Sequence, residues 1–173
     1  MDVNIEKQLV FGTEVTIIGT KHVLSSDYKE QMKSELGRRA PDLVCIEFPE
    51  NGSPHENLGD IEYADIAGAV EYCKETGTEY RCVDKFIEGT VRKIKENIAE
   101  EERAKMRESD SGSEVRKILF SSTKVERDLH KREQTMFSNV LRACSERQYQ
   151  RICMVVGKSH VHGVSGGLET FNV

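Results

Sequence analysis

Hydrophobic positions along the chain form short apolar runs that alternate with longer segments of helical periodicity. Four of these runs have the length and apolar character of buried strands, and they cover residues 15–18, 43–48, 80–83 and 152–156. A preceding segment, 7–11, leads through Gly12 and Thr13 toward the first run, so we expect a hairpin there.

Helices are predicted between these runs. One helix is expected over 27–39, before Pro41, and a second over 60–76, with Gly77 as the residue that follows its C-terminal end. A third is expected over 123–147, where a Thr-x-x-Glu capping box opens the helix. Helices in these places alternate with the apolar runs.

Three further segments are polar. Residues 88–108 carry a sparse apolar stripe and many charges, so we expect a charged helix whose end projects into solvent. Residues 109–113 indicate a flexible break, and the turn-rich segment 49–59 indicates a surface loop of the kind that lines or gates a site.

Strands that alternate with helices predict an α/β fold with a mostly parallel sheet and helices on both faces. The length of 173 residues suits one domain, 1–173, with one core. Ligands in such folds bind beyond the carboxyl ends of the strands, so we look for the site at that edge.

Composition and charge exclude several classes of protein. The net charge of −5 argues against binding to a nucleic-acid backbone, because a basic face would be needed. No apolar stretch reaches membrane-spanning length and the N-terminus lacks the pattern of a signal peptide, so we expect a cytoplasmic protein. The five cysteines contain no C-x-x-C pair, which favours structural thiols.

Two copies of a strand followed by G-x-x-H stand far apart in the chain, at Gly19 to His22 and at Gly157 to His160. We expect each glycine to let the chain turn sharply, so that the histidine points back over the strand ends. Two imidazoles and a carboxylate suit a divalent metal such as manganese, cobalt or zinc, with positions left open for water or substrate. The alternative is that each histidine only hydrogen-bonds a loop backbone.

Glu47 is the carboxylate that completes this set. It lies inside the apolar run LVCIEF, and a buried carboxylate is costly unless it is paired or binds a cation. The alternative is that Glu47 faces solvent at the strand end.

Other polar residues fall near the same edge. Arg132 interrupts the apolar stripe of the 123–147 helix, so it needs an acidic partner or an anionic ligand, unless it forms a surface pair with Asp128. Asp84 ends the third apolar run, and Asp65 shares a helical face with apolar residues but also suits a surface position. His162 is an extra ligand or a solvent-facing loop residue.

With these motifs the chain resembles the TraB/PrgY family, whose wider relatives include Tiki proteases and ChaN/EreA-like proteins. The matching segments are IIGTKHV, PDLVCIEF, KREQTM and VVGKSHVHGV, and the likeness extends over nearly the whole chain. The resemblance implies an EreA/ChaN-like fold and site roles for His22, Glu47, Arg132 and His160. Asp65 stands where the family more often has glutamate, and the family's aspartate maps to Asp84.

What the resemblance implies about activity is mixed. Tiki relatives look like metal-dependent peptidases, PrgY-type members are associated with the shutdown of peptide pheromones, and ChaN-type relatives bind haem. Our leading hypothesis is a divalent-metal-dependent hydrolase, peptidase-like, acting on a peptide or small-molecule substrate. His22 and His160 would hold the metal, Glu47 would be a third ligand or the base, and Arg132 would stabilise an oxyanion.

Two rival functions use the same residues. One is a non-catalytic protein that binds a peptide or haem in the same cleft. The other is a regulatory module that uses the charged 88–108 helix as its contact surface. The sequence leaves assembly into a homo-oligomer open.

Overall fold

A computed structural model describes residues 4–22, 25–49, 63–85, 90–146 and 149–171. The described residues form a five-stranded sheet in the order β1-β2-β5-β3-β4. The strands are β1 (Asn4–Val10), β2 (Thr13–Thr20), β3 (Leu43–Pro49), β4 (Glu79–Asp84) and β5 (Arg151–Gly157). All neighbouring strands are parallel except β1, which pairs antiparallel with β2. The predicted α/β class with a mostly parallel sheet is confirmed.

The β1–β2 hairpin has the predicted position. Val10 pairs with Thr13, and the two residues of the turn, Phe11 and Gly12, both have positive φ, at 49° and 81°. Two left-handed residues in succession are typical of a type I′ turn, whose twist suits the flanking strands. This hairpin puts β1 at the edge of the sheet.

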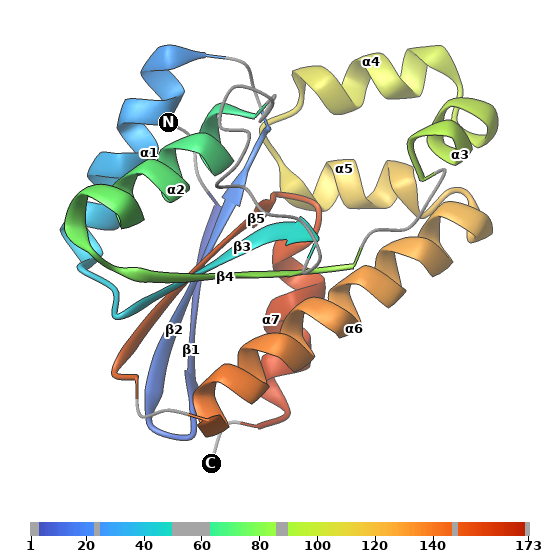
Figure 1. The fold of residues 1–173 in the computed structure, drawn as a ribbon. Helices are drawn as coiled ribbons and strands as arrows, with labels where there is room; N and C mark the ends of the chain where they lie inside the picture. Colours follow the sequence, from blue (N-terminus) through green and yellow to red (C-terminus); the bar gives the residue numbers. More distant parts are fainter. Residues whose placement is uncertain (1–3, 23–24, 50–62, 86–89, 147–148, 172–173) are drawn as a thin grey trace.

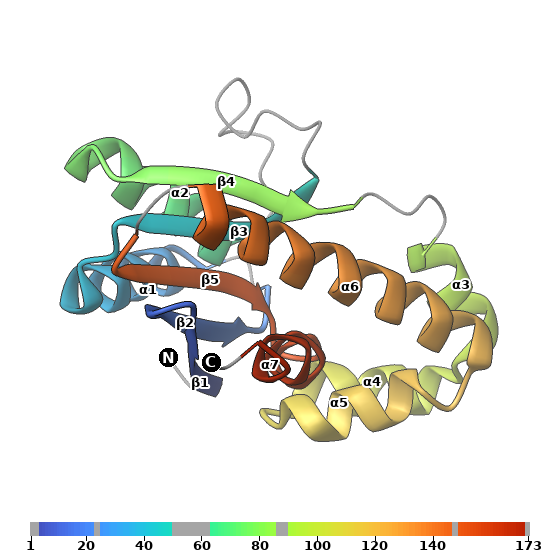
Figure 2. The same ribbon diagram turned by 90° about the horizontal axis from the view of Figure 1, so that it is seen from below.

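Helices cover both faces of the sheet (Figures 1 and 2). One face packs against α1 (Ser26–Arg39) and α2 (Ala64–Thr76), and the other against α6 (Thr123–Glu146) and α7 (Val161–Glu169). Strand β5 shows the reason, since Cys153 and Val155 join the core on the first face while Met154 and Val156 join the core on the second. Successive side chains of a strand point to opposite faces, so a strand between two helical layers is apolar throughout.

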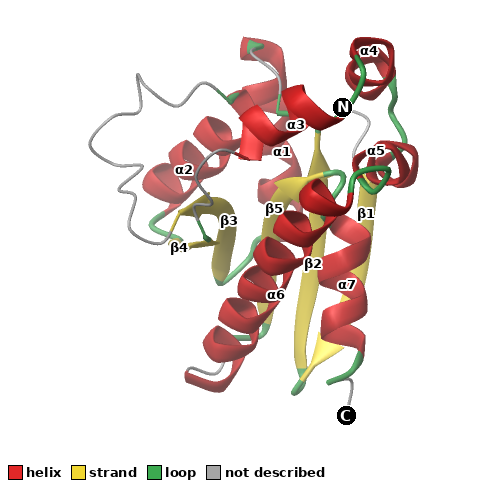
Figure 3. Ribbon diagram, turned by 90° about the vertical axis from the view of Figure 1, so that its right-hand side faces the viewer, coloured by secondary structure: helices red, strands yellow, loops and turns green. Residues whose placement is uncertain are grey.

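The remaining helices form a cap at one end of the sheet, beside the beginning of α6 (Figure 3). They are α3 (Thr90–Asn97), α4 (Glu100–Glu108) and α5 (Gly112–Leu119). A separate apolar cluster joins them to α6, and it includes Ile98, Val115 and Leu129. The cap therefore has a small core of its own.

The helices after β4 differ from the sequence expectations in three ways. The segment 88–108 is not one projecting helix, because α3 and α4 are separate and Ile98, between them, is buried. A break does separate α4 from α5, but it covers only residues 109–111, because Ser111 caps α5 by accepting a hydrogen bond from the Glu114 amide at 3.3 Å. Helix α7 was missed, because its glycine-rich sequence has weak helix propensity.

Two further expectations concern the region before α2. The described helix begins at Ala64, and the predicted start at Asp60 lies outside the described residues. The predicted loop 49–59 also lies outside them, except for Pro49. Within the described part of the chain, no helix is both long enough and apolar enough to cross a membrane.

Candidate functional site

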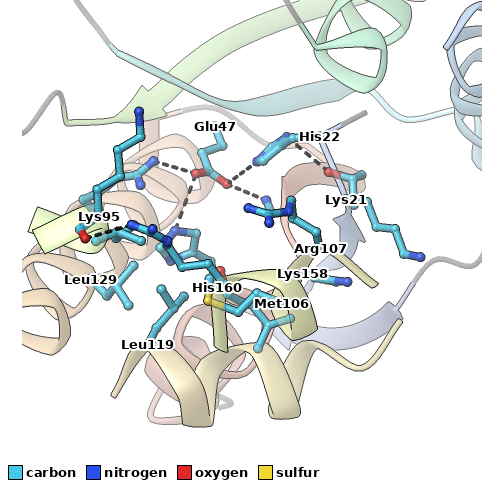
Figure 4. A pocket seen from close by; sticks show the side chains of 17 residues that line it. Lys21, His22, Glu47, Lys95, Met106, Arg107, Leu119, Leu129, Lys158 and His160 are labelled. Carbon is cyan, nitrogen blue, oxygen red and sulfur yellow. Dashed lines mark hydrogen bonds and ion pairs between the residues drawn. The ribbon is translucent and has the colours of Figure 1, made fainter. Parts of the chain in front are cut away.

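Polar side chains gather where the parallel strands end. Glu47 lies in β3 and Asp84 ends β4, while His22 and His160 follow the ends of β2 and β5. His22, Glu47 and His160 line a cavity of about 510 Å³ (Figure 4), and Asp84 is joined to Glu47 through Arg132. The walls of the cavity come from this sheet edge and from helices α3 to α6. A volume of this size suits a small ligand.

His22 is held from both sides of its ring. Its Nδ1 atom lies 2.8 Å from Oδ2 of Asp65 in α2, and its Nε2 atom lies 3.5 Å from Oε2 of Glu47. The hydroxyl of Thr20 donates to the same Asp65 oxygen at 2.5 Å. His22 itself has a positive φ of 53°, an unusual conformation for a residue other than glycine. The backbone is therefore locally strained at the residue that carries this ring.

His160 has the same kind of support from other elements. Its Nδ1 atom lies 3.2 Å from Oε1 of Glu133 in α6, and its Nε2 atom lies 3.5 Å from Oε1 of Glu47. Arg116 of α5 holds Glu133 in turn, with one nitrogen 2.9 Å from Oε2. The two histidines therefore direct their Nε2 atoms at the same carboxylate.

Glu47 is the centre of the cluster and is almost completely buried. Its Oε1 atom accepts a bond from Arg132 at 2.5 Å as well as lying near His160. Its Oε2 atom accepts from the backbone amide of Gly157 and lies near His22. Glu47 therefore does not face solvent.

Arg132 points inward from α6 and bridges two strands. Its Nε atom lies 3.0 Å from Asp84 Oδ2, and its Nη2 atom bonds both Asp84 and Glu47. The alternative surface pair with Asp128 is wrong, because Asp128 is buried and bonds Lys93 at 2.5 Å. Arg132 fixes the positions of the carboxylates at the ends of β3 and β4.

The charges in the cluster shift the pKa values of several of its side chains. Burial opposes ionisation of Glu47, but the charges of His160, Arg132 and His22 hold its pKa well below the usual value. Burial lowers the pKa of His22, but its bonds to Asp65 and Glu47 outweigh burial and raise the pKa to about 10. Burial opposes ionisation of Glu133 too, but bonds to His160 and Arg116 lower its pKa. The described site thus contains ionised carboxylates and a protonated His22 at neutral pH.

The glycines of the two G-x-x-H motifs act differently from the expectation. Gly19 and Gly157 are strand residues, and neither has a positive φ. Gly157 is needed for space, because a Cβ atom there would lie 2.8 Å from the Nε2 atom of His22 and 3.3 Å from Glu47 Oε2. A Cβ atom on Gly19 would collide with Val161. Close packing, not a sharp turn, explains these glycines.

One candidate lies away from the cluster. His162 is exposed on α7 and lines a separate small hollow with His130 and Glu133. Among the predicted site residues, the structure brings together His22, Glu47, Asp65, Asp84, Arg132 and His160.

Sequence reasoning missed the residues that support the histidines. Glu133 was overlooked, although it stands four positions after Leu129 and eight after Val125, and so lies on the apolar stripe of its helix. Thr20 carried no signal, because a threonine near a strand end is ordinary. Arg116 lies in a helix that was not predicted.

The donor set fits a divalent metal ion in its chemistry. Two imidazole Nε2 atoms face one carboxylate, and each Nδ1 atom is held by its own buried carboxylate, as in sites where an outer carboxylate orients a metal-binding histidine. Asp65 also keeps a buried oxygen, Oδ1, with no hydrogen-bond partner among the described residues. In this part of the chain, however, no three His, Cys, Asp or Glu side chains already have the arrangement of a metal site. The side chains as described form an ion-paired network.

Comparisons of the chain with protein-family models, with curated proteins and with solved structures find no significant match in any of the three. The resemblance to the TraB/PrgY family therefore stays a prediction that rests on the sequence motifs.

Proposed function

We propose that the protein is a divalent-metal-dependent hydrolase of the TraB/PrgY type, peptidase-like in its chemistry, with its site at the carboxyl edge of the sheet. One observation carries the proposal. Two histidines, each oriented by a separate buried carboxylate, direct their Nε2 atoms at Glu47 beside a cavity of about 510 Å³. We also keep the cytoplasmic location expected from the sequence.

The metal would be held by His22, His160 and Glu47. When bound, a divalent ion would supply a Lewis acid that polarises a substrate carbonyl and makes water a stronger acid. Asp65 would orient His22 as an outer carboxylate, which agrees with its bond to Nδ1 and with its shorter side chain. Glu133 would do the same for His160.

The other groups would position the substrate and move protons. Ionised Glu47 is the group in the cluster that would take a proton from an attacking water, if it does not ligate the ion. Arg132 uses Nε and Nη2 for its bonds to Asp84 and Glu47, so, among the described residues, Nη1 is the nitrogen left to meet a developing oxyanion. Asp84 would keep that guanidinium in place.

Turnover of a peptide library tests this function. The purified protein should release products, lose activity with a chelator, and regain it with manganese, cobalt or zinc. His22→Ala should abolish turnover and lower the bound metal, whereas the matched control His162→Ala should keep both, because His162 lies outside the cluster. Chelator-resistant turnover, or equal metal in the two variants, would contradict the proposal.

A second candidate is a non-catalytic binding protein that uses the same cavity. It is favoured by the state of Glu47, whose two oxygens are already engaged by Arg132, His160, His22 and the Gly157 amide. A carboxylate whose oxygens already have hydrogen-bond and ion-pair partners is stable in the cavity wall without a bound metal ion. Saturable ligand binding without metal and without turnover would favour this function over the enzyme.

A further inference from the structure

The cavity beside Glu47 has a charge opposite to that of the whole chain. The protein carries a net charge of −5, yet six of the residues that line the cavity are Lys or Arg and one is acidic. A pocket lined by side chains of one charge raises the local concentration of ligands of the opposite charge. The lining therefore indicates an anionic ligand.

Most of these cations already have carboxylate partners. Arg132 is paired with Asp84 and Glu47, Arg103 and Arg107 with Glu100, and Lys21 with Asp110. Lys95 is exposed to water, which screens its charge. Lys158 differs from all of these.

Lys158 is a nearly buried ammonium group without a counter-ion in the described part of the chain. The residue is 9% exposed, and its Nζ atom donates to the backbone carbonyl of Ser109, which carries no charge. No carboxylate of the described residues lies within ion-pair distance of it; the charges that act on it from further away are those of Lys21, which repels, and Glu114, which attracts. A buried charge is costly unless an opposite charge meets it. An anion in the cavity would supply that charge.

Another part of the cavity lining is apolar. Met106, Leu119 and Leu129 line it from α4, α5 and α6, and Figure 4 shows them below Glu47, while Lys21 and Lys158 lie to its right. A ligand that fills this space has an apolar body and an anionic end. A short peptide with an apolar side chain and a free C-terminal carboxylate has both.

We propose that the cavity binds a short peptide by its C-terminal carboxylate, which pairs with the ammonium group of Lys158. This rests on the proposed function, because it assigns the substrate of the same site and makes the protein act near a peptide's C-terminus. A carboxylate is preferred over a phosphate, since one buried ammonium group matches one negative charge. Phosphate sites favour arginine forks, and all three arginines of the cavity are already paired.

Binding of a fluorescently labelled Gly-Leu dipeptide to the metal-free protein tests this without any need for turnover. The wild-type protein should bind the free acid about tenfold or more tightly than the C-terminal amide, as a charge-assisted bond to a buried group predicts. In Lys158→Met this preference should fall to near one, and Lys158→Arg should restore part of it. Lys117→Met is the matched control, since it removes the same charge from an exposed position outside the lining and should leave the preference unchanged.

Each outcome decides the assignment. If the acid and the amide bind equally to the wild type, or if Lys158→Met weakens both by the same factor, Lys158 only holds Ser109 and the inference is wrong. Displacement of the dipeptide by phenyl phosphate at lower concentration than by 3-phenylpropanoate would overturn the choice of a carboxylate. If Lys158→Met does not fold, the wild-type ratio and the Lys158→Arg variant give the answer. Metal-dependent hydrolysis of peptide amides would sustain the proposed function even where this inference fails.

Discussion

The two histidines of the site have the same arrangement but different surroundings. Each has Nδ1 on a buried carboxylate and Nε2 directed at Glu47. His160 is 3% exposed, and its carboxylate, Glu133, is shared with Arg116. The His22 side chain is 25% exposed, and its carboxylate, Asp65, receives the Thr20 hydroxyl. The same arrangement, built from different elements, indicates that what matters is the direction of the two Nε2 atoms.

Removal of Glu47, the carboxylate that both histidines share, should have the largest effect, because it acts on the His22 half and on the His160 half of the site. Glu47→Ala leaves Arg132 and both histidines without their common partner, so the free energy of unfolding should fall by about 3–5 kcal/mol, the usual cost of breaking a buried ion pair. Urea denaturation measures this. The control Glu14→Ala, which removes an exposed pair with Lys7, should cost less than about 1 kcal/mol. Equal losses in the two variants would show that Glu47 does not hold the halves together.

The two halves also depend on different glycines. A Cβ atom on Gly157 would press on His22 and Glu47, and one on Gly163 would collide with the Glu133 carboxylate. Gly157→Ala and Gly163→Ala should each destabilise the protein by about 1–3 kcal/mol in thermal or urea denaturation. Gly166→Ala is the control on the same helix as Gly163, because nothing lies within 4 Å of its added Cβ atom. It should be neutral or stabilising, since alanine favours the helix.

Asp65 and Glu133, the carboxylates that hold the Nδ1 atoms, allow a finer comparison of the two histidines. Asp65→Asn and Glu133→Gln keep the shape but weaken the orientation of one histidine each, so each should reduce metal affinity by about 10–100-fold, as measured by calorimetry. A loss confined to Asp65→Asn would mean that His160 does not bind the ion. Arg116→Met, which removes a partner of Glu133 and a bond to the Ser159 carbonyl, should have a smaller effect in the same direction.

The raised pKa of His22 predicts a slope in stability with pH, the smallest of these effects over a single pH unit. Because its pKa is about 10 in the folded protein against an ordinary 6.5, its stabilising contribution is complete below about 6.5 and is lost as the pH rises through about 10. Between these values the free energy of unfolding should fall by about 1 kcal/mol per pH unit more than in His22→Gln. A metal ion competes with the same proton, so metal affinity should keep rising to about pH 10. Identical pH profiles of the two proteins would contradict the ion-paired description of His22.

Much of the fold could be predicted because apolar periodicity decides it. Strands β2 to β5 appear where the four apolar runs stand, β1 forms the expected hairpin, and Gly77 has the left-handed conformation expected after α2. Helices α5 and α7 were missed because their stability comes from tertiary packing, which local propensity does not report. The cap was misinterpreted for the same reason, since its small core joins residues from four helices.

The site was partly predictable because the carboxyl ends of parallel strands meet at one edge. That rule alone suggests that His22, Glu47, Asp84 and His160 come together. It does not specify what each ring nitrogen contacts, because those partners come from helices whose rotation the sequence leaves undefined. Glu133 is one of these helical partners, while the contacts of Thr20 and of the buried Lys158 depend on side-chain packing that the strand ends do not specify.

Anomalous X-ray diffraction from crystals grown with manganese or zinc tests whether His22, His160 and Glu47 hold a metal ion. We expect an anomalous peak at the carboxyl edge of the sheet, in contact with the Nε2 atoms of His22 and His160 and with a Glu47 oxygen. An ion bound elsewhere, or no ion with His22 still paired to Glu47, would contradict this expectation.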